Sequence, residues 1–303
     1  MPAASPDTRK PLLLDPARWL PQLDPRLYQV LFLGTFLVFG ILALGWYAQV
    51  FQYAAILATA VVVQGVLMLV TQGAAGFRWR SLLSGLITGL GICLLLKANS
   101  TLTLMLAVTF ALLSKFTLRY QKKHFFNPAN FGIIAAIVLT GDAWVSPGQW
   151  GHDGLLVFLF AATGMLITRK VGRLDTTVAF LVTFAGLLYI RSVLWLGWET
   201  DVWLHKLSNG SLLLFAFFMI TDPRSIPDHR LGRVLWAVLI GVAAFVVSIP
   251  GLVAESAYVH TAVIWTLFFA APLTPLIDRL LPAKRFEWQS APTPTEPSGK
   301  TVS

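Results

Sequence analysis

Charged residues are scarce in this chain of 303 residues. Asp, Glu, Lys and Arg make up 12% of it, about half of what soluble domains use, whereas hydrophobic residues make up 56%. Such a chain lacks the polar side chains that would cover a surface facing water, so we expect lipid to surround most of it. Cysteine is nearly absent as well: Cys93 stands alone. This excludes an internal disulfide, and one thiolate cannot hold an iron–sulfur cluster by itself.

Motifs of soluble enzymes are also missing. The sequence has no nucleotide-binding glycine loop after a strand, no zinc-ligand spacing and no nucleophile elbow. Its net charge of +9 is spread over many short stretches and forms no single basic patch. We therefore expect no catalytic residue, no metal site and no nucleic-acid partner. By itself the chain would be at most one subunit of an enzyme.

Ten apolar segments are present, and the basic residues alternate between the gaps that separate them. When each Lys or Arg is assigned to its nearest gap, 20 of the 23 fall in odd-numbered gaps. Because positively charged loops stay in the cytoplasm, this pattern predicts about ten transmembrane helices with both termini cytoplasmic. The predicted segments are residues 27–48, 52–72, 81–97, 101–118, 126–141, 153–168, 174–197, 208–222, 232–250 and 258–281.

No large soluble domain is expected. Residues 1–26 hold four basic residues but no apolar run, so we interpret them as a cytoplasmic N-terminal segment and not as a cleaved signal peptide. Residues 27–281 form the predicted transmembrane domain. Residues 282–303, with Pro, Thr and Ser in abundance, are predicted to be a disordered cytoplasmic tail.

Several segments are too short for a straight crossing, which needs about 20 residues. The third, fifth, sixth and eighth are short and are interrupted or bounded by Asn, Pro, Asp or Gly. Short, broken segments indicate a binding site inside a membrane protein. Five segments in each half would make the second half enter from the opposite side. Two inverted repeats, about 27–141 and 153–281, are therefore allowed, and polar breaks at 97–100 and 221–225 end the third segment of each.

Carboxylates are absent from the segment centres, which argues against a stand-alone ion pump. Lys97 and Lys115 lie near segment ends, from which we expect them to extend to the membrane surface. Asp222 lies at a boundary and needs a partner, either Arg224 or a basic residue of another loop. The alternative is a carboxylate exposed to solvent.

Two polar motifs mark helix boundaries. Asn127 and Pro128 open the fifth segment, since proline suits the first turn of a helix and asparagine suits its cap. Thr221, Asp222 and Pro223 close the eighth, because the residue before a proline leaves the helical region. Each motif is explained either as an ordinary helix boundary or as part of a ligand site.

The runs Phe-Asn-Pro-Ala (126–129) and Phe-Phe-x-x-Thr-Asp-Pro (217–223), together with the ten-segment layout, resemble a known membrane family. It contains the D subunit of Rnf-type electron-transport complexes and the B subunit of sodium-translocating NADH:quinone oxidoreductase. The resemblance covers about residues 27–281. It implies an all-α fold of two inverted five-helix repeats similar to urea-transporter architecture, a place in the bacterial inner membrane, and electron transport through flavins. The partners it implies are other redox subunits or an FMN-carrying protein, with quinone as a further ligand.

The chain departs from this family at one position. Many members carry FMN joined by a phosphoester to the threonine of a Ser-Gly-Ala-Thr run, whereas the run here reads Asn209-Gly210-Ser211-Leu212. Leu212 has no hydroxyl group, and Ser211 stands one place early, which turns its side chain by about 100° on a helix. We therefore expect no covalent FMN, and a flavin (FMN or riboflavin) held without a covalent bond.

The resulting hypothesis is an electron-transfer subunit with a flavin near the broken helices. Phe125, Phe126, Phe217 and Phe218 would supply flat apolar walls, and polar side chains would supply the edges. Two alternatives stay open: a small-solute channel on the same fold, and a membrane scaffold for redox partners. The candidate cofactor-binding residues are Phe126, Asn127, Pro128, Asn130, Gly210, Ser211, Phe218, Thr221, Asp222 and Pro223.

Overall fold

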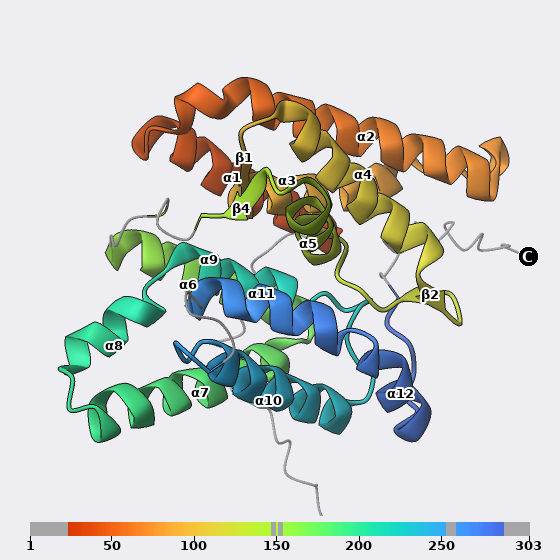
Figure 1. Ribbon diagram of the computed structural model, residues 1–303. Coiled ribbons are helices and arrows are strands. Elements are labelled where there is room, and N and C mark those ends of the chain that lie inside the picture. The colour runs from red at the N-terminus through yellow and green to blue at the C-terminus, as the bar shows by residue number, and fades with distance from the viewer. Residues whose placement is uncertain (1–23, 147–149, 151–153, 253–258, 288–303) are drawn as a thin grey trace, which may run out of the picture.

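The structure is a computed structural model that describes residues 24–146, 150, 154–252 and 259–287, and it is mostly helical (Figure 1). Residues 1–23 of the predicted N-terminal segment and 288–303 of the predicted tail lie outside the described residues. The helices are α1 (Pro25–Ala43), α2 (Val50–Gln72), α3 (Leu82–Leu95), α4 (Thr101–Thr117), α5 (Pro128–Thr140), α6 (Gly154–Val171), α7 (Leu174–Tyr189), α8 (Thr200–Leu207), α9 (Gly210–Leu214), α10 (Arg230–Val247), α11 (Val259–Ala270) and α12 (Leu273–Leu280); the strands are β1 (Leu96–Ala98), β2 (Arg119–Tyr120), β3 (Lys123–His124) and β4 (Ala143–Val145).

Each of the ten predicted segments contains a helix, but only some of these helices could cross a membrane by themselves. Among the described residues, four are long and apolar enough, and the number rises to six if each of two bent helix pairs counts as one span. The chain is therefore a multi-pass membrane protein, with shorter apolar helices beside its long ones. The four are Pro25–Ala43, Trp46–Gln72, Leu174–Trp195 and Arg230–Val247; the bent pairs are Thr200–Leu207 with Gly210–Met219 and Thr261–Ala270 with Leu273–Leu280.

Two features differ from the predicted segments. The tenth segment, predicted as one crossing over 258–281, is bent by 53° between α11 and α12. The reason is Pro272, which cannot continue a helix and stands at the N-cap of α12. The second difference is α8, which lies where a loop is predicted. Its first turn holds Asp201 and its last turn Lys206, so both charges favour a helix through its dipole.

The loops gather at two opposite ends of the molecule. At the end that we call the Lys123 end, the Lys123 ammonium lies 2.7 Å from the Asp278 carboxylate and 2.9 Å from that of Asp228. At the other, the Asp142 end, the Asp142 carboxylate accepts the Ser100 backbone N–H at 3.0 Å. Strands β1 and β4 pair antiparallel at this end. The loops around Lys123, Asp228 and Asp278 thus meet at one end, and those around Ser100 and Asp142 meet at the other.

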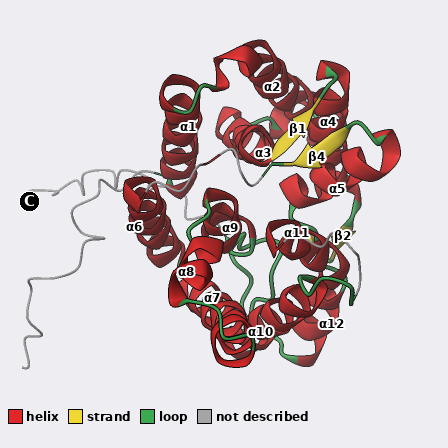
Figure 2. Ribbon diagram, turned by 60° about the vertical axis from the view of Figure 1, so that its left-hand side comes forward, coloured by secondary structure: helices red, strands yellow, loops and turns green. Residues whose placement is uncertain are grey.

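The helices divide into two groups, α1 to α5 and α6 to α12, which occupy the upper and lower parts of both views (Figures 1 and 2). In the first group, α1 packs on α3, α2 on α3 and α4, and α4 on α5. In the second, α6 packs on α9, α7 on α10, and α10 on α11. The groups meet where α1 contacts α6 and where α5 contacts α11.

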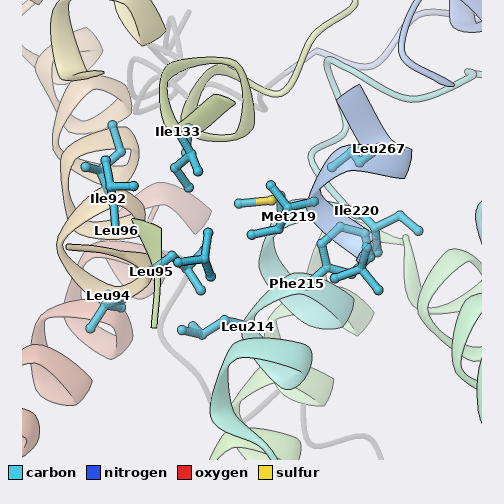
Figure 3. Packing of buried hydrophobic residues seen from close by; sticks show 14 of the residues in the cluster. Ile92, Leu94, Leu95, Leu96, Ile133, Leu214, Phe215, Met219, Ile220 and Leu267 are labelled. Atoms are coloured by element: carbon cyan, nitrogen blue, oxygen red, sulfur yellow. The ribbon is translucent and has the colours of Figure 1, made fainter. Parts of the chain in front are cut away.

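Small residues allow the closest of these approaches. A Cβ atom on Gly132 of α5 would lie 2.3 Å from the Ala107 carbonyl oxygen of α4, so only glycine fits at this crossing, as is common between membrane helices. Part of the interior between the two groups is apolar. Figure 3 shows Leu95 and Ile133 of the first group converging with Leu214 and Met219 of the second, all in one buried cluster.

Candidate functional site

Asn127 joins two broken helices to each other. Its side-chain oxygen accepts the Asn130 backbone N–H at 3.0 Å and so caps α5, with Pro128 in the first turn. The side-chain nitrogen of the same residue donates to the Met219 carbonyl oxygen at 3.1 Å. That carbonyl lies in the last turn of another helix, where backbone acceptors lack helical partners. One amide therefore satisfies backbone groups at the beginning of α5 and near the end of the helix that starts with α9.

The helix that starts with α9 changes from α-helical to π-helical geometry before it ends. Residues Phe215–Met219 form a π-helical turn, a widened geometry that is frequent at functional sites. The chain then leaves the helix at Ile220, and the Thr221 hydroxyl donates back to the Phe217 carbonyl. Pro223, two residues later, prevents any continuation. The π turn and this exit project Phe218 and Asp222 towards the capped start of α5.

A cavity of about 90 Å³ lies between these two breaks. A space of this size holds several water molecules or part of a ring-shaped ligand. Helices α1, α3 and α4 and the start of α5 supply one side of its wall, and the π turn with the following loop supplies the other. Of the ten sequence-predicted residues, the structure brings five to this wall: Asn127, Pro128, Phe218, Asp222 and Pro223.

Three other predicted residues lie next to the cavity wall and serve the packing behind it. The Asn130 side chain donates to the Ile264 carbonyl of α11 at 2.8 Å. The Phe126 ring packs against Phe268, with ring centroids 5.2 Å apart. Thr221 is held by its bond to the π turn. These residues connect α5, α11 and the exit of the π turn, and so determine the position of the wall without forming it.

Gly210 and Ser211 lie at the opposite end of the same helix. Asn209 caps this end by accepting the Ser211 backbone N–H at 2.9 Å. A Cβ atom on Gly210 would lie 2.6 Å from the ring of Trp150, and Leu212 is 0% exposed. The structure therefore does not bring Gly210 and Ser211 to the cavity. With no hydroxyl at Leu212 and no space around it, these residues do not fit a covalent FMN.

Lys115 is a wall residue that the sequence interpretation missed. We expected its side chain to extend to the membrane surface, and this is wrong. The residue is 6% exposed, and its ammonium group donates to the side-chain oxygens of Gln64 at 3.0 Å and Ser84 at 2.8 Å. Lys115 lies on the face of α4 that packs against α2 and α3, so its side chain enters the protein and not the lipid. Its place near a segment end was the available signal, but the sequence does not tell which face is buried.

His124 is the basic residue of another loop that Asp222 needs. Its Nε2 atom lies 3.5 Å from the Asp222 carboxylate, whose second oxygen accepts the Arg224 backbone N–H at 3.2 Å. Burial lowers the pKa of His124; Asp222 partly opposes this, and the charges of Lys115 and Arg224 add to it. The histidine is therefore held towards its neutral form, in which one ring nitrogen donates and the other accepts.

The chemistry of the wall is mixed. Apolar side chains such as Leu95, Ile87 and Phe218 alternate with amide, imidazole, carboxylate and ammonium groups. Ligand sites commonly combine apolar walls with a few polar groups that orient the ligand. Of the other phenylalanines expected as walls, Phe217 packs over Gly164 and Phe125 lines a separate pocket. The arrangement can hold part of an apolar ring whose edges carry hydrogen-bonding groups.

Comparison with known proteins finds a family match in the second half of the chain. Residues 138–287 match the model of the family described as "NQR2, RnfD, RnfE family". This stretch includes the π turn and Asp222, and begins after Asn127.

Curated relatives are similar over shorter stretches. The chain is 27% identical over 170 residues to the D subunit of the ion-translocating oxidoreductase complex of Stutzerimonas stutzeri, which covers 52% of this chain and 44% of that protein. For the protein of the same name from Yersinia pestis the identity is 29% over 141 residues, with 46% and 36% covered. For that of Halorhodospira halophila it is 33% over 144 residues, with 47% and 37% covered. The matched region thus spans about two fifths of each relative.

Proposed function

The chain belongs to the NQR2, RnfD, RnfE family through residues 138–287, and we propose that it is an integral membrane subunit of a flavin-dependent electron-transport system. The observation that supports this most is the cavity between the capped start of α5 and the π turn, with apolar walls and polar edges. Its relatives are subunits named for an ion-translocating oxidoreductase complex. This chain would likewise depend on other redox subunits, on an FMN-carrying partner or on quinone to complete a reaction.

The flavin of this proposal, FMN or riboflavin, is bound without a covalent bond. Phe218 and the aliphatic residues of α3 would contact the ring faces, while Asn127 and the His124–Asp222 pair would contact polar ring edges. Phe126, Asn130 and Thr221 would hold these groups in place, and Gly210 and Ser211 are not included. A flavin accepts and donates one or two electrons, which the side chains of this wall cannot do alone. The chain's contribution is to bind the ring, orient it and keep water away from it.

The proposed fold is two inverted repeats, about 27–141 and 153–281, with ten crossings in all. The matching helix contacts in the two groups support it. In this correspondence α1 matches α6, α2 matches α7, α3 matches α9, α4 matches α10 and α5 matches α11. Three packed pairs of the first group, α1 with α3, α2 with α4 and α4 with α5, then have packed counterparts in the second, α6 with α9, α7 with α10 and α10 with α11. The contacts of α1 with α6 and of α5 with α11 join equivalent helices, as a two-fold relation between repeats requires.

The proposed orientation puts the Lys123 end, and both termini, in the cytoplasm of a bacterium, with the chain in the inner membrane. The excess of Lys and Arg in the loops of that end supports it. Reporter fusions test it: green fluorescent protein fused after Lys122 should fluoresce, and alkaline phosphatase fused after Ser208 should be active. If both positions report the same side of the membrane, the proposed layout is wrong.

The function is tested by the colour of the purified protein. We expect detergent-solubilised protein from flavin-producing cells to show flavin absorbance and fluorescence, and acid to release the flavin without ester hydrolysis. Gly91→Leu should lower the flavin-to-protein ratio about tenfold. Gly91 lies on the cavity wall, and a Cβ atom there is only 3.4 Å from Ala129, so a leucine occupies the cavity without a large clash.

The matched control is Gly186→Leu. A Cβ atom on Gly186 of α7 meets no atom within 4 Å, so this variant adds the same side chain outside the cavity and should keep its flavin. A colourless wild-type protein that conducts a neutral solute in liposomes would contradict the proposal in favour of a channel. A colourless, non-conducting protein that co-purifies with redox partners would contradict it in favour of a scaffold.

A further inference from the structure

Helix α12 carries an exposed apolar stripe that continues from α11. Leu273, Leu276 and Leu280 of α12 are 37, 52 and 69% exposed. Phe269 of α11 is 69% exposed and precedes them at the spacing of one helix face. The stripe thus crosses the 53° bend between the two helices. Because α11 is an apolar helix of a membrane protein, a surface that continues from it faces lipid.

The opposite face of α12 is fixed to the protein by polar contacts. The Thr274 hydroxyl donates to the Ser225 carbonyl oxygen at 3.1 Å. The Asp278 carboxylate accepts the Lys123 ammonium at 2.7 Å and the Asp228 backbone N–H at 2.8 Å. A helix with one polar and one apolar face is typical of helices that lie at a membrane surface.

A basic pocket of about 180 Å³ lies where the chain continues beyond α12. Residues 281–287, which we call the C-terminal segment, contribute Arg285 to it. The turn between β2 and β3 contributes Lys122, and the loop after the π turn contributes Arg224. The Arg285 guanidinium donates to the backbone carbonyl and side-chain oxygens of Gln121. Both acceptors are neutral, so they hold the guanidinium in place without cancelling its charge.

Basic side chains outnumber acidic ones in this pocket. Four basic and two acidic side chains line it. Of the two acids, Asp228 already accepts the Lys123 ammonium at 2.9 Å, which leaves Glu287 for the three bases named above. Those three form no ion pair with any described residue. The pocket therefore keeps an excess of positive charge, and Arg279, in the last turn of α12, adds to it beside the stripe.

We propose that α12 and the basic pocket together bind a phospholipid with an anionic headgroup. Its acyl chains contact the apolar stripe, and its phosphate lies between Lys122, Arg224 and Arg285. Basic pockets beside membrane helices bind such headgroups, and ammonium and guanidinium groups form strong charge-assisted hydrogen bonds with phosphate oxygens. An acidic protein segment would fit the pocket but leave the stripe unused, which favours the lipid.

Three separate parts of the chain meet at this phosphate. Helix α12 and the hairpin of β2 and β3 lie at the same end of the molecule (Figure 1), and the loop after the π turn completes the pocket. A bound headgroup therefore holds the C-terminal segment against the loop that leads into α5 and against the loop that ends the helix from α9. This inference goes beyond the proposed function and needs no flavin, so either can fail without the other.

Contact of the stripe with lipid is measured by fluorescence quenching. Cys93 is 0% exposed, so a cysteine introduced at the surface of the full chain takes a thiol-reactive fluorophore alone. In nanodiscs, phospholipids with a nitroxide on an acyl chain should quench the label on Leu276→Cys at least about twofold more than that on Lys284→Cys. The control position is exposed and lies in the C-terminal segment. Equal quenching at the two positions would overturn the proposal.

Headgroup preference is measured with the same labelled protein. Nitroxide-labelled phosphatidylglycerol and phosphatidylcholine are compared at equal amounts in phosphatidylcholine nanodiscs. The ratio of their association constants should be at least about fivefold in favour of phosphatidylglycerol, which is the effect of about one basic residue at a membrane surface. High salt should lower this ratio. A ratio near one in low salt would refute the lipid site.

Variants that remove one charge assign the preference to the pocket. Lys122 is exposed in its turn, so Lys122→Gln should fold normally and bring the ratio close to one. Arg230→Gln is the matched control, because the Arg230 side chain is 83% exposed, lies at the same end and is not part of the pocket; it should keep the ratio. Equal loss in both variants would mean that general charge attracts the lipid, and full retention in Lys122→Gln would mean that the phosphate lies elsewhere. Either result contradicts the proposed site.

Discussion

The helix that starts with α9 is tightly packed at its first residues and borders a cavity at its last. At its start, Gly210 touches Trp150 and Leu212 is completely buried. At its end, about ten residues and 15 Å further on, a π turn and Asp222 border a cavity that is lined by Lys115 and His124. The first end is closed by packing, and the second is open because two chain breaks face each other. The cavity of the described structure therefore lies at the Asp222 end of this helix, away from Leu212.

The difference has a simple physical origin. A small residue at a helix start lets a large ring approach, and Trp150 fills the space above Gly210. At the other end α5 begins only at Pro128 and Pro223 prevents the helix from α9 from continuing, so neither helix fills the gap. Asn127 and the loop around Asp222 form hydrogen bonds with the backbone groups that these breaks leave without helical partners. The side chains that form these bonds therefore lie at the edge of the cavity.

Truncation of two leucines of α9, of which only Leu214 lines the cavity, gives the largest expected effect. Leu212→Ala and Leu214→Ala both remove a buried side chain of α9 and should each lower the free energy of unfolding by about 2–5 kcal/mol. Only Leu214 lines the cavity, so only Leu214→Ala should change the dissociation constant of flavin. Unfolding in mixed micelles and flavin titration of the folded fraction measure the two effects. If Leu212→Ala weakens flavin binding as much as Leu214→Ala does, the distinction between a packed end and a ligand-binding end of this helix is wrong.

Acid should weaken the two ends of the molecule in separate pH windows, with smaller effects. Burial lowers the pKa of His124, so the unfolded chain takes up the proton more readily than the folded one. Stability at the Lys123 end should therefore fall as the pH drops below about 6.5. At the other end, hydrogen bonds from Ser100, Thr103 and Asn99 lower the pKa of Asp142. Its contribution is present above about pH 4 and is lost below it.

Thermal unfolding followed across pH measures both windows. His124→Gln should flatten the upper one and keep the lower one, and Asp142→Asn should do the reverse. The assignment to His124 is wrong if the upper decrease persists unchanged in His124→Gln.

Local patterns predicted much of this arrangement. Every predicted segment contains a helix, since long apolar runs bounded by turn residues have few other solutions in lipid. The cap at Asn127 and the helix exit at Asp222 followed from asparagine and proline chemistry alone. The bend at Pro272 was missed although the proline was visible, because the length of the apolar run was taken as one crossing.

The composition of the cavity could not be predicted in the same way. Lys115 and His124 are far from Asp222 in the sequence. Lys115 belongs to no motif, and His124 stands in the run that leads into Asn127 without any sign that it would meet Asp222. Whether Lys115 points to lipid or inwards depends on how α4 is rotated against α2 and α3. That rotation is determined by side-chain packing between helices, of which the close contact of Gly132 with α4 is one element.

The sequence by itself determined that the chain is a multi-pass membrane protein, which ten stretches contain helices, and that no hydroxyl is available at Leu212. These properties depend on composition and on neighbouring residues. Only the tertiary structure decided that the two helix breaks face each other, that Trp150 closes the start of α9, and that a buried lysine has no carboxylate in contact within the described part of the chain. These depend on contacts between residues distant in the chain, and such contacts form only when the two groups of helices pack together.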